Sequence, residues 1–250
     1  MDENTFDYLV WAWILLALII FPFQFKTTAP YGRHTRKGWG PLMDNRLGWI
    51  LMELVSLLGF AWFFLSGDAS SDINWFFFFC WMIHYVNRTF IFPLRTKTQG
   101  KQIPIAVVFM AMVFNTGNGF FNGYYFGHLR NYDISWMYDA RFWIGFVLFW
   151  GGFIINQQAD NILISLRKVG EKGYKIPVGG LFNWISCANH FGEIIQWFGF
   201  AVMTWSLPAL SFAIWTAANL IPRAISHHRW YKSHFPDYPE KRKAVFPKLL

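Results

Sequence analysis

The sequence predicts an all-α polytopic membrane protein with seven transmembrane helices, and three observations support this fold class. Hydrophobic residues make up 54% of the 250 residues and charged residues only 14%, whereas soluble domains carry about 25% charged residues. The 29 Phe and 15 Trp suit a lipid-facing surface with aromatic belts at its interfaces. Long apolar runs recur along the chain, and in lipid only a helix satisfies the backbone of such a run internally.

Seven apolar runs define the predicted spans, and most approach the ~20 residues that a helix needs to cross a bilayer. They cover residues 8–23, 47–65, 73–94, 104–122, 141–158, 189–205 and 207–222. Only the turn around Ser206, Leu207 and Pro208 separates the last two runs, so these are the least distinct.

The charges between the runs predict the orientation. Segments 24–46, 95–103 and 159–188 and the tail after residue 222 are basic, whereas 66–72 and 123–140 are acidic or nearly neutral. Because basic loops face the cytoplasm, we expect the N-terminus outside and the C-terminus in the cytoplasm. This topology also accounts for the formal net charge of +8, and no compact basic module for nucleic acid is present.

Several other classes of site are not expected. Cys80 and Cys187 are the only cysteines and lie in apolar surroundings, which disfavours a disulfide framework or structural zinc. We expect no metal site, because no carboxylate or thiol stands at ligand spacing from the histidines near the C-terminus. The acidic N-terminus lacks the basic region of a signal peptide, so the first run is predicted to be a retained helix.

Ionisable groups inside apolar runs are costly and usually functional. Glu53 lies several residues inside the second run, with Trp49 four residues earlier on the same helical face. Tyr85 belongs to a polar patch, 84–89, in the third run. The alternative, a structural carboxyl paired with a neighbouring helix, remains open.

Three polar stripes occur near the predicted cytoplasmic helix ends. The stripes are Asn156, Asp160 and Arg167, then Asn189, Glu193 and Trp197, and finally Arg223, His227 and Tyr231. Spacings of four and seven residues put each stripe on one helical face if the helix continues. Arg suits bidentate phosphate contacts, so the stripes indicate a phosphate-bearing ligand, with snorkelling and inter-helix pairs as the alternative.

A dense set of motifs in these regions resembles the steroid 5α-reductase (3-oxo-5α-steroid 4-dehydrogenase) family. The motifs are HYVNRTF at 84–90, NTGNGFFNGYY at 115–125, LRKVGEKGYKIPVGGLF at 166–182, ANHFGEIIQWFGF at 188–200, TWSLPAL at 204–210 and RAISHHRWYKSHFPDYPEKRKAVFP at 223–247. Upstream, YGRHT at 31–35 and the set Arg46, Trp49, Glu53 and Leu54 also match. So many motifs in the right order make the resemblance highly specific.

The resemblance implies one membrane domain over residues 1–250, with its cofactor-binding part at about 84–250, and NADPH-dependent reduction of the Δ4 bond of a 3-oxo steroid. By matching motifs, Glu53 and Tyr85 are the catalytic residues that hold the substrate 3-oxo group, and we expect Trp49 and Trp197 to wall the flat rings. The residues implied in cofactor binding are Arg33, Asn156, Asp160, Arg167, Asn189, Glu193, Arg223, His227 and Tyr231. Two positions depart from the family pattern: Arg33 stands where Lys is frequent, and Met52 stands where Gln is common.

The expected chemistry places negative charge on the substrate carbonyl oxygen as hydride adds to the enone, and Tyr85 is a suitable donor to that oxygen. Glu53 donates as well if it is protonated, or orients Tyr85 if it is ionised, and both readings remain open. Competing functions are reduction of another lipid enone or enoyl thioester, a membrane S-adenosylmethionine-dependent methyltransferase, and a sterol-binding protein without activity. We expect a monomer in the endoplasmic reticulum or in a bacterial inner membrane.

Overall fold

The computed structural model of the chain describes all residues except 69–70, 98–99, 169–170 and 172. Three positions of the 166–182 motif, Val169, Gly170 and Lys172, therefore lie outside the described residues. The described chain divides into two compact units. The first comprises Met1–Val10 and Ala29–Phe142, and the second comprises Trp11–Thr28 and Trp143–Leu250.

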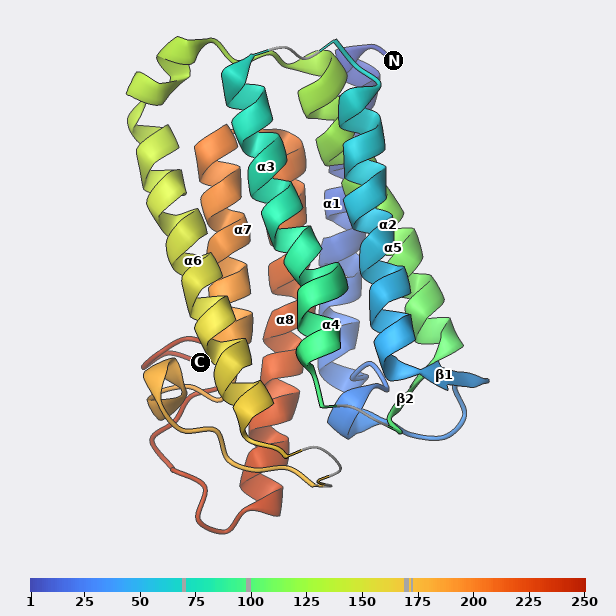
Figure 1. Cartoon of the computed structure of the whole chain (residues 1–250), viewed down its shortest axis with the longest axis vertical. Coiled ribbons are helices and arrows are strands. Elements are labelled where there is room, and N and C mark those ends of the chain that lie inside the picture. The colour runs from blue at the N-terminus through green and yellow to red at the C-terminus, as the bar shows by residue number, and fades with distance from the viewer. Residues whose placement is uncertain (69–70, 98–99, 169–170, 172) are drawn as a thin grey trace. The chain divides into compact units, whose positions relative to one another are not determined.

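Seven helices of 15 residues or more occur in the described part of the chain, one for each predicted run (Figure 1). They are α1 (Glu3–Lys26), α2 (Asn45–Leu65), α3 (Asp72–Val86), α5 (Ile105–Tyr124), α6 (Ala140–Ser165), α7 (Ala188–Thr204) and α8 (Leu207–His234). By length and composition, three helical segments of the described chain can cross a membrane: α1, α2 and Ile105–Leu129. The helical class is confirmed, while seven crossings and the orientation stay predictions.

Short elements connect the long helices. The π-helical turns η2 (Asn87–Ile91) and η3 (Tyr125–Leu129) follow α3 and α5, and α4 (Phe92–Arg95) follows η2, so one helical stretch covers the predicted run 73–94. The remaining short elements are the 3₁₀ turns η1 (Gly32–His34), η4 (Ile134–Tyr138) and η5 (Gly180–Asn183) and the strands β1 (Leu42–Asp44) and β2 (Gln102–Pro104).

The two strands form an antiparallel pair that the sequence did not predict. Each strand runs directly into a helix, β1 into α2 and β2 into α5. The Asp44 carboxylate caps α2 by accepting from the N–H groups of Arg46 and Leu47, at 2.9 and 3.0 Å. The pair therefore joins the first turns of α2 and α5. Segments of three residues are too short to show the alternation from which strands are predicted.

Within the first unit, α2 and α5 make the most extensive contact between helices (Figure 1). Glycines allow their backbones to touch. A methyl group on Gly123 would lie 2.6 Å from the Phe60 carbonyl oxygen, and one on Gly119 would lie 3.0 Å from the Phe60 nitrogen. No side chain larger than hydrogen fits at Gly123, so this contact fixes α2 against α5.

Asn74 anchors the start of α3 in the same unit. Its fully buried amide nitrogen donates to the carbonyls of Phe126 and Arg130, at 2.7 and 2.6 Å, and its oxygen accepts from the N–H of Tyr132 at 2.9 Å. One polar side chain thus satisfies backbone groups left over where the η3 turn ends.

Within the second unit, glycines also hold α6 against α7. A methyl group on Gly152 would lie 2.6 Å from the Gly192 carbonyl oxygen, and one on Gly192 would lie 2.5 Å from the Asn156 nitrogen. α7 also packs along α8. Residues 11–28 of α1 belong to this unit, where the Trp215 indole donates to the Trp13 carbonyl at 3.0 Å.

The helical stripe expected through Arg167 is wrong, because α6 ends at Ser165. The Ser165 hydroxyl donates to the Ile162 carbonyl at 2.8 Å, and the Glu171 carboxylate accepts from the Lys168 N–H at 2.9 Å. Such local side-chain bonds compete with helical ones and end the helix. Arg167 therefore lies in the loop. In contrast, α8 continues to His234 and keeps the stripe of Arg223, His227 and Tyr231 on one face.

Candidate functional site

In the first unit, Glu53 of α2 and Tyr85 of α3 lie at the same height along two neighbouring helices. Phe60 of α2 stacks on Trp81 of α3, with ring centroids 4.5 Å apart, and the Arg88 guanidinium lies 5.1 Å from the Trp49 ring. Glu53 lies between Trp49 and Phe60 on one face of α2, and Tyr85 lies in the last turn of α3, between Trp81 of that helix and Arg88 of the following turn η2. The two contacts therefore place the predicted carboxyl and phenol opposite each other on neighbouring helices.

Aromatic packing orients the Tyr85 ring. It stacks on Trp81 at 5.0 Å and meets the edge of His84 at 5.0 Å, and only 3% of Tyr85 is exposed. Since Trp81 is itself stacked between Phe60 and Tyr85, the phenol cannot turn without moving this row of rings. Glu53 is half-buried.

Arg88 is a residue of this region to which sequence reasoning gave no role. Its buried guanidinium lies over both Trp49 and Phe92, at 5.1 and 4.9 Å from the ring centroids. It belongs to the π-helical turn η2, directly after α3, and such turns are frequent at functional sites. The signal that could have identified it is a cation inside an apolar run.

Arg33 and Met52 complete the predicted positions of this unit. Arg33 is half-buried in η1, two residues after Tyr31, whose ring meets the edge of Trp49 at 6.3 Å. The Met52 side chain is buried in an apolar cluster with residues of β2 and α5, and its carbonyl accepts from the Asn115 amide at 2.6 Å. Met52 thus serves packing between α2 and α5.

In the second unit, the stripes on α6 and α7 meet. The fully buried Asn156 amide donates to the carbonyl of Asn189 at 3.0 Å, at the level where Gly192 allows the helices to touch. Asp160 lies one turn further along α6 with 2% of its surface exposed, and Glu193 lies half-buried one turn further along α7. Since α6 and α7 run antiparallel, the two stripes meet at Asn156 and Asn189, and Asp160 and Glu193 lie one turn away on opposite sides of that contact.

The stripe on α8 joins them through two histidines. The rings of His190 and His227 lie 5.6 Å apart, which connects the first turn of α7 to α8. Arg223 and Tyr231 are 7% and 2% exposed, and Tyr231 stacks on Tyr238 of the tail at 5.2 Å. Sequence reasoning did not select His190, although it directly follows Asn189.

Arg167 reaches the same region from its loop. Its guanidinium lies 4.5 Å from the centroid of the Tyr174 ring, and Tyr174 packs edge-on against Trp230 of α8 at 5.0 Å. These contacts join the loop to the end of α8 near His227.

Arg242 in the tail is a second cation that the sequence reasoning missed. It is only 5% exposed, and one of its terminal nitrogens donates to the Pro177 carbonyl at 2.9 Å. Its Nε has no partner among the described residues. A buried guanidinium with an unsatisfied donor favours an anion, so the cationic lining of this unit fits a phosphate-bearing cofactor.

Trp197 lies in the core of the second unit. It is fully buried and packs on Phe149, Phe200 and Phe212, the last at 4.3 Å. Its role in the substrate cavity stays a prediction. In all, Arg33, Trp49, Glu53 and Tyr85 belong to the first unit and the other nine predicted residues to the second.

Comparisons with known proteins cover the whole chain. A family model described as "3-oxo-5-alpha-steroid 4-dehydrogenase" matches residues 101–250. The steroid 5-alpha-reductase DET2 of Gossypium hirsutum is 40% identical over 252 residues, covering 98% of this chain and 98% of its own length. The human 3-oxo-5-alpha-steroid 4-dehydrogenase 1 is 36% identical over 252 residues, covering 100% of this chain and 97% of its own length.

Proposed function

This protein belongs to the steroid 5α-reductase (3-oxo-5-alpha-steroid 4-dehydrogenase) family, and from that membership we propose that it uses NADPH to reduce the Δ4 bond of 3-oxo-Δ4 steroids. It is an oxidoreductase, and its apolar helices fit a membrane protein. The product is the corresponding 5α-3-oxosteroid.

The facing positions of Glu53 and Tyr85 support this function best. Reduction adds hydride at C5 of the steroid, negative charge develops on the 3-oxo oxygen, and C4 takes up a proton. A donor fixed in an apolar site stabilises that oxygen without reorganisation and is worth about 3–4 kcal/mol. The Tyr85 hydroxyl acts as this donor, because the ring row Phe60, Trp81 and Tyr85 holds it in place.

Glu53 assists the same oxygen in one of two ways. Protonated, it donates a second hydrogen bond to that oxygen; ionised, it orients Tyr85, whose single hydrogen stays on the substrate oxygen. Glu53 is half-buried and lies one turn from Trp49, and this position is compatible with either protonation state. The Trp49 ring packs against Arg88 and Tyr31 and provides an apolar surface one turn from the Glu53 carboxyl.

The cofactor NADPH supplies the hydride when bound. The second unit offers what this anionic ligand requires: buried or half-buried polar groups on α6, α7 and α8 and the cations Arg167, Arg223 and Arg242. The Asn156 amide, held by its bond to the backbone carbonyl of Asn189, and the Asn189 side chain would orient polar groups of the ligand, and the guanidinium groups would bind its phosphates. The role of Arg33, which belongs to the first unit, stays a prediction from the family resemblance.

We further propose that all seven long helices cross the membrane, with the N-terminus outside and the cofactor-binding ends in the cytoplasm, and that the enzyme acts as a monomer. The basic loops and tail support this orientation. An apolar substrate would then enter from the bilayer and a charged cofactor from the cytosol.

Turnover by the purified protein tests the proposal. In detergent, a 3-oxo-Δ4 steroid such as testosterone and NADPH should give stoichiometric loss of nicotinamide absorbance and a 5α-dihydro product, assigned by mass spectrometry and stereochemical standards. NADH should be a poorer donor. A 5β product, or no nicotinamide oxidation with any 3-oxo-Δ4 steroid, would contradict the proposal.

A further inference from the structure

A buried serine ties three segments of the second unit together. Ser186, which is 3% exposed, precedes α7 by two residues. Its hydroxyl oxygen lies 2.6 Å from Nδ1 of His228 in α8 and 2.6 Å from the Tyr238 hydroxyl in the tail. The Lys243 carbonyl lies 3.1 Å away. This Ser186 network joins the segment before α7, the end of α8 and the C-terminal tail, residues 235–250.

The number of hydrogen bonds that each group can donate and accept limits which group is the donor in each bond of the network. A serine hydroxyl has one hydrogen to donate and accepts through its lone pairs. The Lys243 carbonyl already accepts from the Ser186 N–H at 2.8 Å. The Lys243 carbonyl can accept a second bond, but Nδ1 of His228 at 2.6 Å is closer to the Ser186 hydroxyl than that carbonyl at 3.1 Å, so we assign the Ser186 hydrogen to Nδ1 of a neutral His228 and the Tyr238 hydrogen to Ser186.

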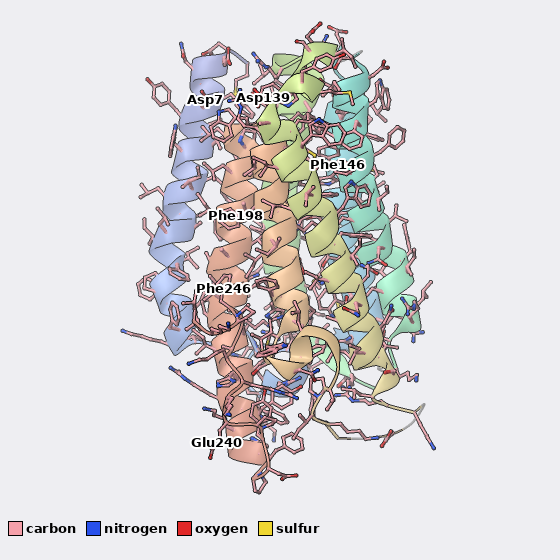
Figure 2. All side chains as sticks on the ribbon, turned by 90° about the vertical axis from the view of Figure 1, so that its left-hand side faces the viewer. Asp7, Asp139, Phe146, Phe198, Glu240 and Phe246 are labelled. Carbon is pink, nitrogen blue, oxygen red and sulfur yellow. The ribbon has the colours of Figure 1, made fainter. Side chains whose placement is uncertain are left out.

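Backbone bonds surround the network and lay the tail against the same segment. The Lys243 N–H donates to the Trp184 carbonyl at 3.0 Å, and the Cys187 N–H donates to the Ala244 carbonyl at 3.1 Å. Val245 is fully buried beside Cys187. In Figure 2, Glu240 lies near the end of α8 and Phe246 lies further back along that helix, so the tail returns over the unit.

The network lies beside two predicted cofactor-binding residues. α7 begins at Ala188, so the position of Ser186 sets where Asn189 enters the helix and meets Asn156. His228 directly follows His227, whose ring packs near that of His190. Displacement of the tail would therefore reach both sides of the predicted cofactor site.

We propose that Ser186 is a positioning residue that, through His228 and Tyr238, locks the C-terminal tail across the start of α7 and holds Asn189 and His227 for the cofactor. The inference rests on the proposed function of binding NADPH. Ser186 touches neither substrate nor cofactor, so its loss should weaken cofactor binding while the hydride step, once the cofactor is bound, keeps its rate.

The test compares Ser186→Ala with Ser186→Thr, which keeps the hydroxyl, in the full-length protein. For Ser186→Ala we expect the NADPH dissociation constant, measured by fluorescence without steroid, to rise at least fivefold. The KM for NADPH should rise in parallel, and kcat at saturating NADPH should stay within twofold. Trypsin should cleave the tail after Lys241 to Lys243 faster, while Ser186→Thr should behave as wild type in all these measurements.

Ser211→Ala is the matched control, because Ser211 is also a buried serine of this unit and its hydroxyl has no partner among the described residues. It should change none of these values. If Ser186→Ala does not fold, His228→Asn, which keeps a polar atom near the Nδ1 position, should give a smaller increase of the dissociation constant than His228→Leu.

Two results would overturn the inference: an unchanged dissociation constant in Ser186→Ala, or a loss confined to kcat. The proposed function fails differently. If the wild-type protein binds no NADPH, the function and the inference both fall, whereas wild-type binding with no difference between the variants removes only the inference.

Discussion

At the scale of single residues, catalysis depends on how tightly one phenol is held. Tyr85 has a hydrogen-bonding tip at the end of a ring that is stacked on Trp81 and almost fully buried. A donor fixed in this way loses little entropy when charge develops on a carbonyl oxygen. The hydroxyl should therefore matter for kcat far more than for folding.

Tyr85→Phe should lower kcat by tenfold to several hundredfold, about 1.4–4 kcal/mol, because the ring packing remains while the donor is removed. Steady-state turnover of a 3-oxo-Δ4 steroid measures this. Tyr132→Phe, another buried tyrosine of the first unit, should stay within twofold of wild type. Full turnover by Tyr85→Phe with intact folding would remove Tyr85 from the catalytic site.

Arg167→Ala should raise the KM for NADPH about tenfold, because a charge-assisted hydrogen bond to phosphate is worth about 1.5–3 kcal/mol. The contact with Tyr174 places this guanidinium next to α8. Lys168→Ala changes a neighbouring exposed cation and should leave the KM nearly unchanged. An unaltered KM in Arg167→Ala would show that Arg167 does not contact the cofactor.

The His228 network should make cofactor binding sensitive to acid. Burial lowers the pKa of the His228 imidazole below its ordinary value, and Lys232 and Lys243 lower it further; the Tyr238 ring is its other titratable neighbour, at 5.9 Å. Because the pKa of His228 is lower in the folded than in the unfolded protein, its neutral ring stabilises the fold above the unfolded pKa of about 6.5. This stabilisation is lost as the pH falls through the pKa of the folded state.

The NADPH dissociation constant should therefore be flat from about pH 8 to 6.5 and rise below that, as protonation removes the acceptor at Nδ1. His228→Asn should reduce the acid-dependent rise. His234→Asn, at an exposed position on the same helix, should keep the wild-type profile. Identical profiles for wild type and His228→Asn would contradict this role.

At the scale of elements, glycine contacts set the distances between helix pairs. Gly123 holds α5 against α2, and Gly152 and Gly192 hold α6 against α7. The second contact lies beside the bond between Asn156 and Asn189, so the spacing of these helices and the geometry of the predicted cofactor site are set together. α6 offers a natural comparison, because a methyl group on Gly151 would meet no described atom within 4 Å.

Gly152→Ala should lower the thermal midpoint in detergent, because its methyl group would overlap the α7 backbone; overpacking of this kind costs about 1–3 kcal/mol. The neighbouring Gly151→Ala should leave the midpoint unchanged or raise it, since Ala is favoured over Gly in a helix by about 0.5–1 kcal/mol. Equal midpoints for the two variants would show that α6 and α7 are not in backbone contact.

At the scale of the whole molecule, the function requires that one end of the helices faces the cytosol. Two exposed residues test this orientation, Tyr138 in the 123–140 segment and Lys241 in the tail. The natural cysteines, Cys80 and Cys187, are buried and give a low background for thiol labelling.

In intact cells, an impermeant maleimide should label Tyr138→Cys, whereas Lys241→Cys should react only after lysis, because positive charge retains the tail on the cytoplasmic side. Both variants should be labelled equally in detergent. Labelling of Lys241→Cys alone in intact cells would invert the proposed topology.

Much of this architecture could be predicted because its signals are local. The apolar runs predicted one long helix each, and the spacing of Arg223, His227 and Tyr231 correctly predicted a continuous α8. The stripe through Arg167 was wrong because local side-chain bonds near Ser165 end α6, and β1 and β2 were missed because their pairing is non-local.

The sequence by itself determined the helical class, the family and the residue types of the site, since apolar length, charge and ordered motifs are properties of the chain. The tertiary structure decided which side chains meet: Tyr85 stacked on Trp81 at the level of Glu53, Asn156 bound to Asn189, and Ser186 bound to His228 and Tyr238. These contacts join segments up to 52 residues apart in the chain, and their geometry arises from packing between helices, which helical periodicity cannot specify.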